Sequence, residues 1–182
     1  MTVARLLPAF VVTCLALLSS QAEAYTVAAG DFTLRPVAGA STNFLRLDVA
    51  TRETPPSGLL VGVDFDYAVL PELAVAATLR PVFGDAFVDA QAGLGAKYRL
   101  VQTEAPLIPY GSLLAVVALG TPLRYGDAHW NVGGRLGLGA DYFIVRDVTV
   151  GLELGTEASW LVSPVGALEL TAELLLGVGW RF

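Results

Sequence analysis

The stretch "VTVGLELGTEASWLV" (residues 148–162) alternates with a period of two. Its even-numbered positions, from Val148 to Val162, are almost all apolar, whereas its odd-numbered positions are mostly polar or glycine. Successive side chains of a β-strand point to opposite faces, so this pattern predicts a strand with one apolar and one polar face. A helix would instead repeat its apolar positions every three or four residues.

The same alternation recurs along the chain. The uncharged stretch between Glu104 and Arg124 is the one place where a membrane-spanning helix is an alternative, but its prolines and glycines and the strands on both sides favour another strand. We therefore predict eight strands, at residues 31–49, 58–69, 72–83, 86–100, 108–123, 130–145, 148–162 and 167–182.

The composition indicates a membrane protein. The 182 residues are 54% hydrophobic and only 15% charged, with a mean hydropathy of +0.61. Backbone groups in lipid must be satisfied internally, which leaves helix bundles and closed barrels. With strand periodicity, the predicted fold is an all-β, transmembrane, eight-stranded antiparallel up-and-down barrel formed by residues 25–182. The net charge of −6 gives no reason to expect nucleic-acid binding.

The first 24 residues have the layout of a secretory signal peptide. Arg5 precedes an apolar run, and the small residues Ala22 and Ala24, on either side of Glu23, come just before the expected cleavage site. The alternatives are a retained transmembrane anchor, for which the run is short, and a lipoprotein modified at Cys14. Cys14 is the only cysteine, so the mature chain would form no disulfide. Export across the inner membrane, with cleavage after Ala24, is the expectation.

Aromatic residues divide between the two ends of the predicted strands. If residues 70–72, 101–107 and 146–147 are periplasmic turns, two interfacial girdles result. The twelve steps from Trp130 to Tyr142 rise roughly 30 Å at ~3.3 Å per residue and a tilt of about 40°, enough to cross an apolar band of ~25 Å. The lower girdle comprises Tyr67, Tyr98, Tyr142, Trp180 and Phe182, and the upper one Phe83, Trp130 and Trp160.

Whether the apolar positions of a strand are odd- or even-numbered predicts the length of the turn that joins it to the next strand. The lipid face is even-numbered on both sides of residues 146–147, which predicts a three-residue turn (145–147) with Ile144 opposite Val148. Across residues 83–86 the parity changes, which suits a two-residue turn with Phe83 opposite Ala86. The first strand changes parity along its length, so we expect a bulge near residues 40–42. The register of the strand at 108–123 is left open.

Inward-facing charges are expected to form an ion-pair network. The predicted registers place Arg80 opposite Asp89 and Arg135 opposite Glu157. If Val162 pairs with Leu168, Glu157 also faces Glu173, and two carboxylates would share Arg135. Eight strands enclose a space that side chains can fill, so a polar plug is favoured over a gate or ion path. The further expected members are Asp64, Glu153 and Glu169.

An enzymatic role would most plausibly need His129, the single histidine. Extending the register brings it opposite Ser163, with Asp127 two residues away, a combination that could form a triad at the outer mouth. One histidine without cysteines offers no metal-ligand cluster, and no cofactor is expected. The glycines of "GRLGLGAD" (134–141) and "AGLGAKY" (92–98) lack the strand-to-helix context of a phosphate loop.

The chain resembles the eight-stranded outer-membrane barrels of Gram-negative bacteria, of the OmpA, OmpX and OmpW type. Besides the leader and the alternating strands, the last residues, "LLLGVGWRF" (174–182), are similar to the C-terminal signature read by the barrel-assembly machinery, with Trp180 and Phe182 as its aromatic positions. This resemblance implies periplasmic chaperones, insertion by that machinery, and contact with outer-membrane lipid and lipopolysaccharide. We expect no periplasmic peptidoglycan-binding domain.

Three functions follow from these observations. The leading hypothesis is a non-enzymatic integral outer-membrane protein, structural or surface-interacting, with a lumen filled by ion pairs. The second is a narrow channel for small or apolar solutes. The third is a lipid-modifying enzyme that uses His129. The oligomeric state and any ligand stay open.

Overall fold

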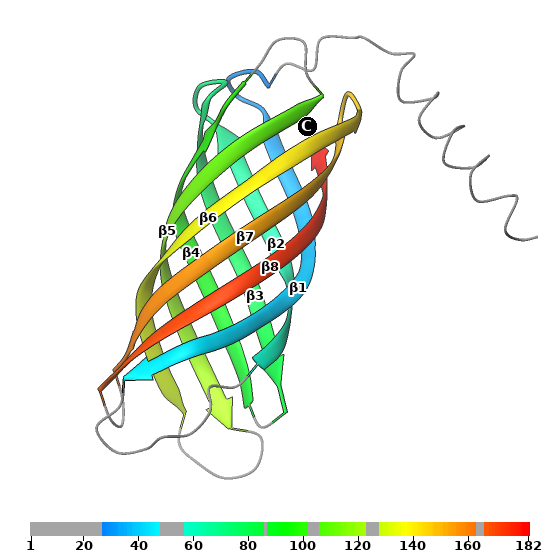
Figure 1. Ribbon diagram of the computed structural model, residues 1–182. Coiled ribbons are helices and arrows are strands. Elements are labelled where there is room, and N and C mark those ends of the chain that lie inside the picture. The colour runs from blue at the N-terminus through cyan, green and yellow to red at the C-terminus, as the bar shows by residue number, and fades with distance from the viewer. Residues whose placement is uncertain (1–26, 48–56, 86, 102–105, 123–127, 163–165) are drawn as a thin grey trace, which may run out of the picture.

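The computed structural model describes residues 27–47, 57–85, 87–101, 106–122, 128–162 and 166–182. Eight strands make up most of this described part (Figure 1). The predicted bounds differ from the observed ones by at most two residues at either end. The strands are β1 (Phe32–Leu47), β2 (Ser57–Ala68), β3 (Leu73–Gly84), β4 (Phe87–Arg99), β5 (Leu107–Pro122), β6 (His129–Val145), β7 (Val148–Leu161) and β8 (Ala167–Arg181).

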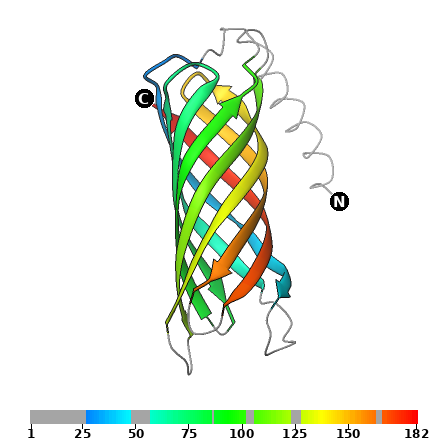
Figure 2. The same ribbon diagram turned by 90° about the vertical axis from the view of Figure 1, so that its left-hand side faces the viewer.

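The strands close into a barrel, which is visible from two sides in Figures 1 and 2. Each strand pairs antiparallel with its neighbours in chain order, and β1 closes the ring by pairing with β8. At this seam the Phe32 and Phe182 backbones exchange hydrogen bonds, with N···O distances of 3.1 and 2.8 Å. The predicted all-β up-and-down barrel is confirmed. No helix within the described ranges is long and apolar enough to span a membrane.

The two ends of the barrel differ. We call the end that holds the β2–β3, β4–β5 and β6–β7 connections, together with Phe182, the terminal end, and the opposite one the loop end. Residues of the described segment before β1 cover the terminal end. Gly30, at a φ of 95°, lets the chain turn there, and its backbone N–H donates to the Ala68 carbonyl at 2.7 Å. This turn places Val27 inside the barrel mouth.

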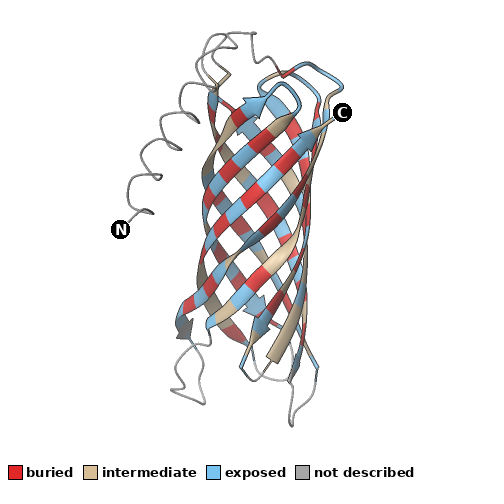
Figure 3. Cartoon of the chain, turned by 90° about the vertical axis from the view of Figure 1, so that its right-hand side faces the viewer, coloured by how far each residue is buried: buried red, intermediate tan, exposed pale blue. Residues whose placement is uncertain are grey.

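Alternating burial runs along the strands, as the checkered pattern in Figure 3 shows. In β7, Glu153 is 5% exposed, whereas its neighbour Leu154 is 61% exposed. The outer surface is therefore a continuous field of large apolar side chains, far more than a soluble monomer exposes. Most charged residues of the described strands face inward. The apolar outer face and the polar inner face both follow from the period of two in the sequence, because neighbouring side chains of a strand lie on opposite faces of the barrel wall.

The β6–β7 hairpin corrects one prediction. Its turn contains two residues, Arg146 and Asp147, and Val145 pairs with Val148. The three-residue turn with Ile144 opposite Val148 is wrong. The register shifts between Phe143 and Val145, so Ile144 is an extra residue, a β-bulge. The bulge restores the parity that a plain two-residue turn would have reversed.

Two registers at the loop end also differ from prediction. Phe83 pairs with Val88, so the β3–β4 turn is longer than two residues, and its Ala86 lies outside the described residues. Arg80 consequently lies opposite Gln91 instead of Asp89. The second corrected register is that of β7 and β8, in which Trp160, not Val162, pairs with Leu168. Both errors are shifts of two residues, which leave every side chain on its predicted face.

The first and fifth strands settle the two open registers. The β1–β8 pairing shifts between Asn43 and Leu45, so the expected bulge exists, but at Phe44 and not at residues 40–42. Strand β5 is apolar on both faces. It buries Leu114 and Val116 inside the barrel against Ala76 of β3, which explains its lack of charge.

Candidate functional site in the barrel interior

The middle of the barrel holds a buried ion-pair network. Strands β1 to β8 each contribute an inward-facing polar group, and the described network contains as many cationic as anionic side chains. Its cations are Arg35, Arg80, Lys97, Arg99 and Arg135. Its carboxylates are Asp64, Asp66, Asp141, Glu153 and Glu173.

Asp64 of β2 joins two arginines. The Arg80 Nε and Nη2 atoms each donate at 2.8 Å, one to each carboxylate oxygen of Asp64. Arg35 of β1 contributes its Nη2 at 3.3 Å. The two-atom contact with Arg80 is the bidentate geometry that suits a planar guanidinium. Arg80 therefore does belong to the network, but its partner is Asp64 and not the predicted Asp89.

Arg135 of β6 contacts two carboxylates, as expected. One is the predicted Glu173, but the other is Glu153 and not Glu157. On the backbone Arg135 lies opposite Glu157. Its guanidinium, however, contacts Glu173 through Nε at 2.6 Å and Glu153 through Nη2 at 2.5 Å. Glu173 itself lies opposite Gly155, because of the corrected β7–β8 register. Gly155 leaves room for the arginine, whose Nη2 would lie 2.6 Å from any added Cβ.

The half of the network nearer the terminal end was missed from the sequence. Lys97 Nζ lies 2.8 Å from Asp66 and 3.3 Å from Asp141. It also sits 3.7 Å above the ring centre of Tyr110, a cation–π contact. The remaining missed contacts are Arg99 to Asp66 at 3.2 Å, Arg35 to Asp141 at 2.6 Å, and Tyr110 Oη, which accepts from Arg35 at 3.1 Å and donates to Glu153 at 2.8 Å.

These side chains fill the centre of the barrel. The cavity among the arginines and Lys97 measures about 10 Å³, and the one nearest the terminal end about 20 Å³. A single water needs roughly 10–15 Å³ of such space. Between the network and the terminal end, Val27 packs with Ala68, Ile108 and Phe143 in an apolar cluster. The described interior is thus closed by charge in the middle and by apolar side chains at the terminal end.

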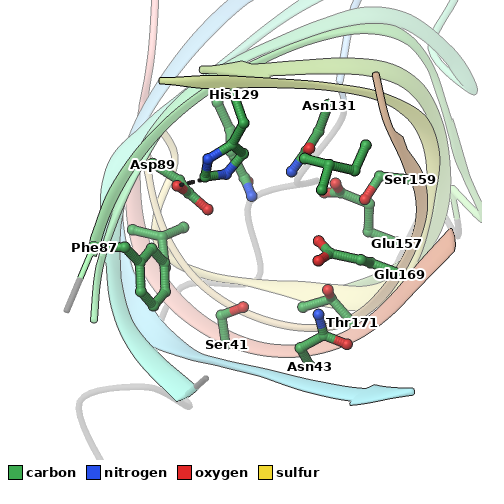
Figure 4. A pocket seen from close by; sticks show the side chains of 13 residues that line it. Ser41, Asn43, Phe87, Asp89, His129, Asn131, Glu157, Ser159, Glu169 and Thr171 are labelled. Atoms are coloured by element: carbon green, nitrogen blue, oxygen red, sulfur yellow. Dashed lines mark ion pairs between the residues drawn. The ribbon is translucent and has the colours of Figure 1, made fainter. Parts of the chain in front are cut away.

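A larger cavity opens at the loop end. It has a volume of about 260 Å³, and we call it the cup (Figure 4). His129 and Asp89 stand on one wall, with His129 Nε2 and Asp89 Oδ1 3.7 Å apart. Glu157 and Glu169 line the opposite wall. Of the expected triad only His129 can be placed, because Ser163 and Asp127 lie outside the described residues; its charged neighbour is Asp89.

The eight aromatic residues expected to form two girdles lie within the strands or, for Phe182, directly after the last one. Seven of the eight are exposed on the outer surface, from Trp180 at 42% to Phe182 at 74%, whereas Tyr142 is half-buried. Tyr67, Tyr98, Tyr142, Trp180 and Phe182 lie toward the terminal end, and Phe83, Trp130 and Trp160 toward the loop end. Their arrangement in two belts follows from the strand order, while contact with a lipid interface stays a prediction.

The described residues contain no group of three or more histidine, cysteine, aspartate or glutamate side chains that could hold a metal ion. What the interior offers is a set of mutually paired charges and one polar cup. Together with the apolar exterior, this defines a class: a closed eight-stranded barrel built inside out, the architecture of transmembrane β-barrels.

Solved structures of outer-membrane barrels share this fold. The N-terminal β-barrel domain of Pseudomonas aeruginosa OprF superposes with a TM-score of 0.61 at 15% identity, over 84% of this chain and 98% of that one. Pseudomonas aeruginosa OprG gives 0.60 at 14% identity, over 88% and 99%. Neisserial surface protein A gives 0.63 at 16% identity, over 84% and 97%. No protein-family model and no curated protein sequence matches the chain.

Proposed function

We propose that the chain is a non-enzymatic, integral outer-membrane barrel protein with a sealed lumen. Its role on this reading is structural or surface-interacting, with lipid and lipopolysaccharide around the apolar wall and the loop end facing outward. Residues 1–24 would direct export and be removed. Delivery would depend on periplasmic chaperones and the barrel-assembly machinery.

The filled interior is the observation that carries this proposal. The five cationic and five anionic side chains of the described network cross the lumen and leave cavities of about 10 and 20 Å³ among them and toward the terminal end. A hydrated ion or a small solute needs a continuous path many times larger. The apolar cluster around Val27 adds a second barrier at the terminal end. A narrow conduit would require both barriers to open.

Conductance in planar lipid bilayers tests the sealed lumen. The purified full-length mature protein, refolded and inserted, should give no reproducible channel steps at moderate voltage. Insertion is verified separately, because a folded barrel migrates differently from the boiled protein on a gel. Discrete steps of constant size from protein shown to be folded would contradict the sealed lumen and favour the channel.

A further inference from the structure

The cup at the loop end is lined by polar side chains that can both donate and accept hydrogen bonds. Strands β1, β4, β6, β7 and β8 supply them from different sides of one space of about 260 Å³ (Figure 4). An ionised carboxylate only accepts and an ammonium group only donates, whereas hydroxyl and amide side chains do both. The hydroxyl and amide residues of the lining are Ser41, Asn43, Gln91, Asn131, Ser159 and Thr171.

The three carboxylates of the cup each have a basic residue beside them. Strand register gives the partner of the first two, and a distance of 3.7 Å between Oδ1 and Nε2 gives that of the third. The pairs are Glu157 with Arg135, Glu169 with Arg46, and Asp89 with His129. Because basic residues accompany the carboxylates, a ligand of the cup needs no charge of its own.

Two amide side chains in the cup wall are buried without a full set of partners. Asn131 is 6% exposed and Asn43 is 9% exposed, and the Oδ1 atom of each has no hydrogen-bond partner. They belong to β6 and β1 and face the cup from different sides (Figure 4). Buried amide groups are normally paired, so hydroxyl groups of a molecule in the cup would complete these contacts.

An aromatic ring supplies part of the cup wall. Phe87 packs against the buried apolar cluster that contains Leu60 and Val82, and this contact holds the ring beside the polar groups (Figure 4). A molecule with hydroxyl groups around its edge and C–H groups on its faces matches such a lining. Drug-sized ligands occupy pockets of roughly 300–1,000 Å³, so the cup, at about 260 Å³, suits one small ring and not a chain of several.

We infer that the cup binds a single neutral pyranose ring of a sugar. The sugar hydroxyls donate to the amide oxygens of Asn43 and Asn131 and to the cup carboxylates, and they accept from the amide and hydroxyl donors of the wall. One C–H face of the ring packs against Phe87. A free monosaccharide and the terminal residue of a longer glycan present the same chemistry to this site.

Titration calorimetry with methyl glucoside, methyl galactoside and methyl mannoside tests the site on the refolded full-length mature protein. The detergent must carry no sugar headgroup. At least one of these neutral hexosides should bind, and its 2-amino analogue, which carries an ammonium group, should bind no more tightly. A trisaccharide that ends in the same hexose distinguishes the two sources. Its binding supports the end of a glycan as the ligand, and its exclusion supports the free sugar; either result agrees with a pyranose site.

Three variants and a control locate the binding in the cup. Asn131→Leu and Asn43→Leu should each weaken binding of the hexoside at least about fivefold, because a sugar hydroxyl loses its buried partner. Ser41→Leu places a larger side chain in the cup and should weaken binding more than about tenfold. Thr121→Val is the control and should bind like the wild type, since Thr121 is exposed near the end of β5 and does not line the cup.

Each variant is first checked for folding by its gel shift on heating. Failure of all three hexosides to bind the folded protein would overturn the inference. So would tighter binding of the amino sugar than of its neutral parent, or wild-type affinity in folded Asn43→Leu and Asn131→Leu. Binding in the cup involves only the loop end of the barrel, so these outcomes are independent of whether the lumen conducts.

Discussion

Three arginines of the central network, Arg35, Arg80 and Arg135, each contact more than one carboxylate. Arg35 approaches Asp64, Asp141 and Glu153, at 3.3, 2.6 and 3.8 Å. Arg80 similarly lies 3.6 Å from Glu173, besides its two-atom contact with Asp64. In a dry interior an unpaired charge is costly, whereas a completed set of pairs is tolerated. The network is therefore most sensitive to the loss of a single member.

Arg135→Met should destabilise the barrel by about 3–5 kcal/mol, the typical cost of leaving a buried charge without its partner. The change strips Glu153 and Glu173 of their shortest contacts, at 2.5 and 2.6 Å. Urea unfolding of the protein refolded in lipid vesicles measures the free-energy difference. The double variant Arg135→Met/Glu173→Met should recover much of the loss, because an apolar pair replaces the ionic one.

Arg146→Met provides the matched control for Arg135. Arg146 is exposed in the β6–β7 turn, so its substitution should change stability by no more than about 0.5 kcal/mol. Similar small effects for Arg135→Met and Arg146→Met would show that the buried pairs do not hold the barrel together.

Residue by residue, parity in the sequence placed charges such as Arg80, Arg135 and Glu153 on the inner face, but it did not identify which of them meet. Arg35 was missed because the first strand changes parity at its bulge. Tyr110 was missed because the uncharged fifth strand has apolar side chains on both faces and no register could be derived for it. Arg80 was assigned to Asp89 because the predicted β3–β4 register was wrong by two residues. Its actual partner, Asp64, lies diagonal to it on the other neighbouring strand, within reach of the long guanidinium. Side-chain reach is not encoded in strand periodicity.

Among the structural elements, the β6–β7 hairpin shows how a bulge and a turn together conserve parity. Tyr142 pairs with Val150, and both belong to the even-numbered outer face. Ile144 is the extra residue, and the pairs on its two sides, Phe143 with Thr149 and Val145 with Val148, form a regular two-residue hairpin without it.

Deleting Ile144 should therefore be tolerated. The chain would keep the pairs on both sides of the bulge, and every other side chain would stay on its present face. A gel shift on heating should persist, with a stability change of about 1 kcal/mol or less, as for an exposed site without a special structural role. Deletion of Leu152, which pairs regularly with Ala140, is the control and should abolish folding, because it turns half of β7 inside out. Loss of the folded form on deletion of Ile144 would instead favour the three-residue turn.

The positions of the strands could be predicted from alternation, while two registers at the loop end could not. A shift of two residues preserves the inward and outward faces, so hydrophobic patterning does not distinguish Phe83 opposite Ala86 from Phe83 opposite Val88. Only the geometry of the connecting turn decides, and "FGDA" (83–86) carries no compelling two-residue signature beyond its Gly-Asp pair. In β1 the alternation changes parity, which correctly predicted a bulge. The predicted position, residues 40–42, was two residues short of the observed one at Phe44.

For the whole molecule, the apolar exterior and the charged interior have to be explained together. Outward residues such as Leu138 and Leu94 are 73% and 62% exposed, an arrangement that costs free energy in water but not in lipid. The closed ring gives the backbone N–H and C=O groups of every strand edge a hydrogen-bonding neighbour, and the ion pairs occupy the lumen. Residence in a bilayer accounts for all three features and makes a prediction that depends on depth.

Arginine placed on the outer wall should be costly at mid-height and nearly harmless at the rim. Leu154 lies near the middle of β7 and Val162 directly follows its last residue; both are well exposed, at 61% and 57%. Leu154→Arg should cost about 2–4 kcal/mol and Val162→Arg at most about 1 kcal/mol, since the penalty for a cation follows its depth in the hydrocarbon. Urea unfolding in phospholipid vesicles gives both values, with Leu154→Met as the control for lost packing. Equal costs at the two positions would mean that β7 does not cross a bilayer, and the membrane assignment would fail with it.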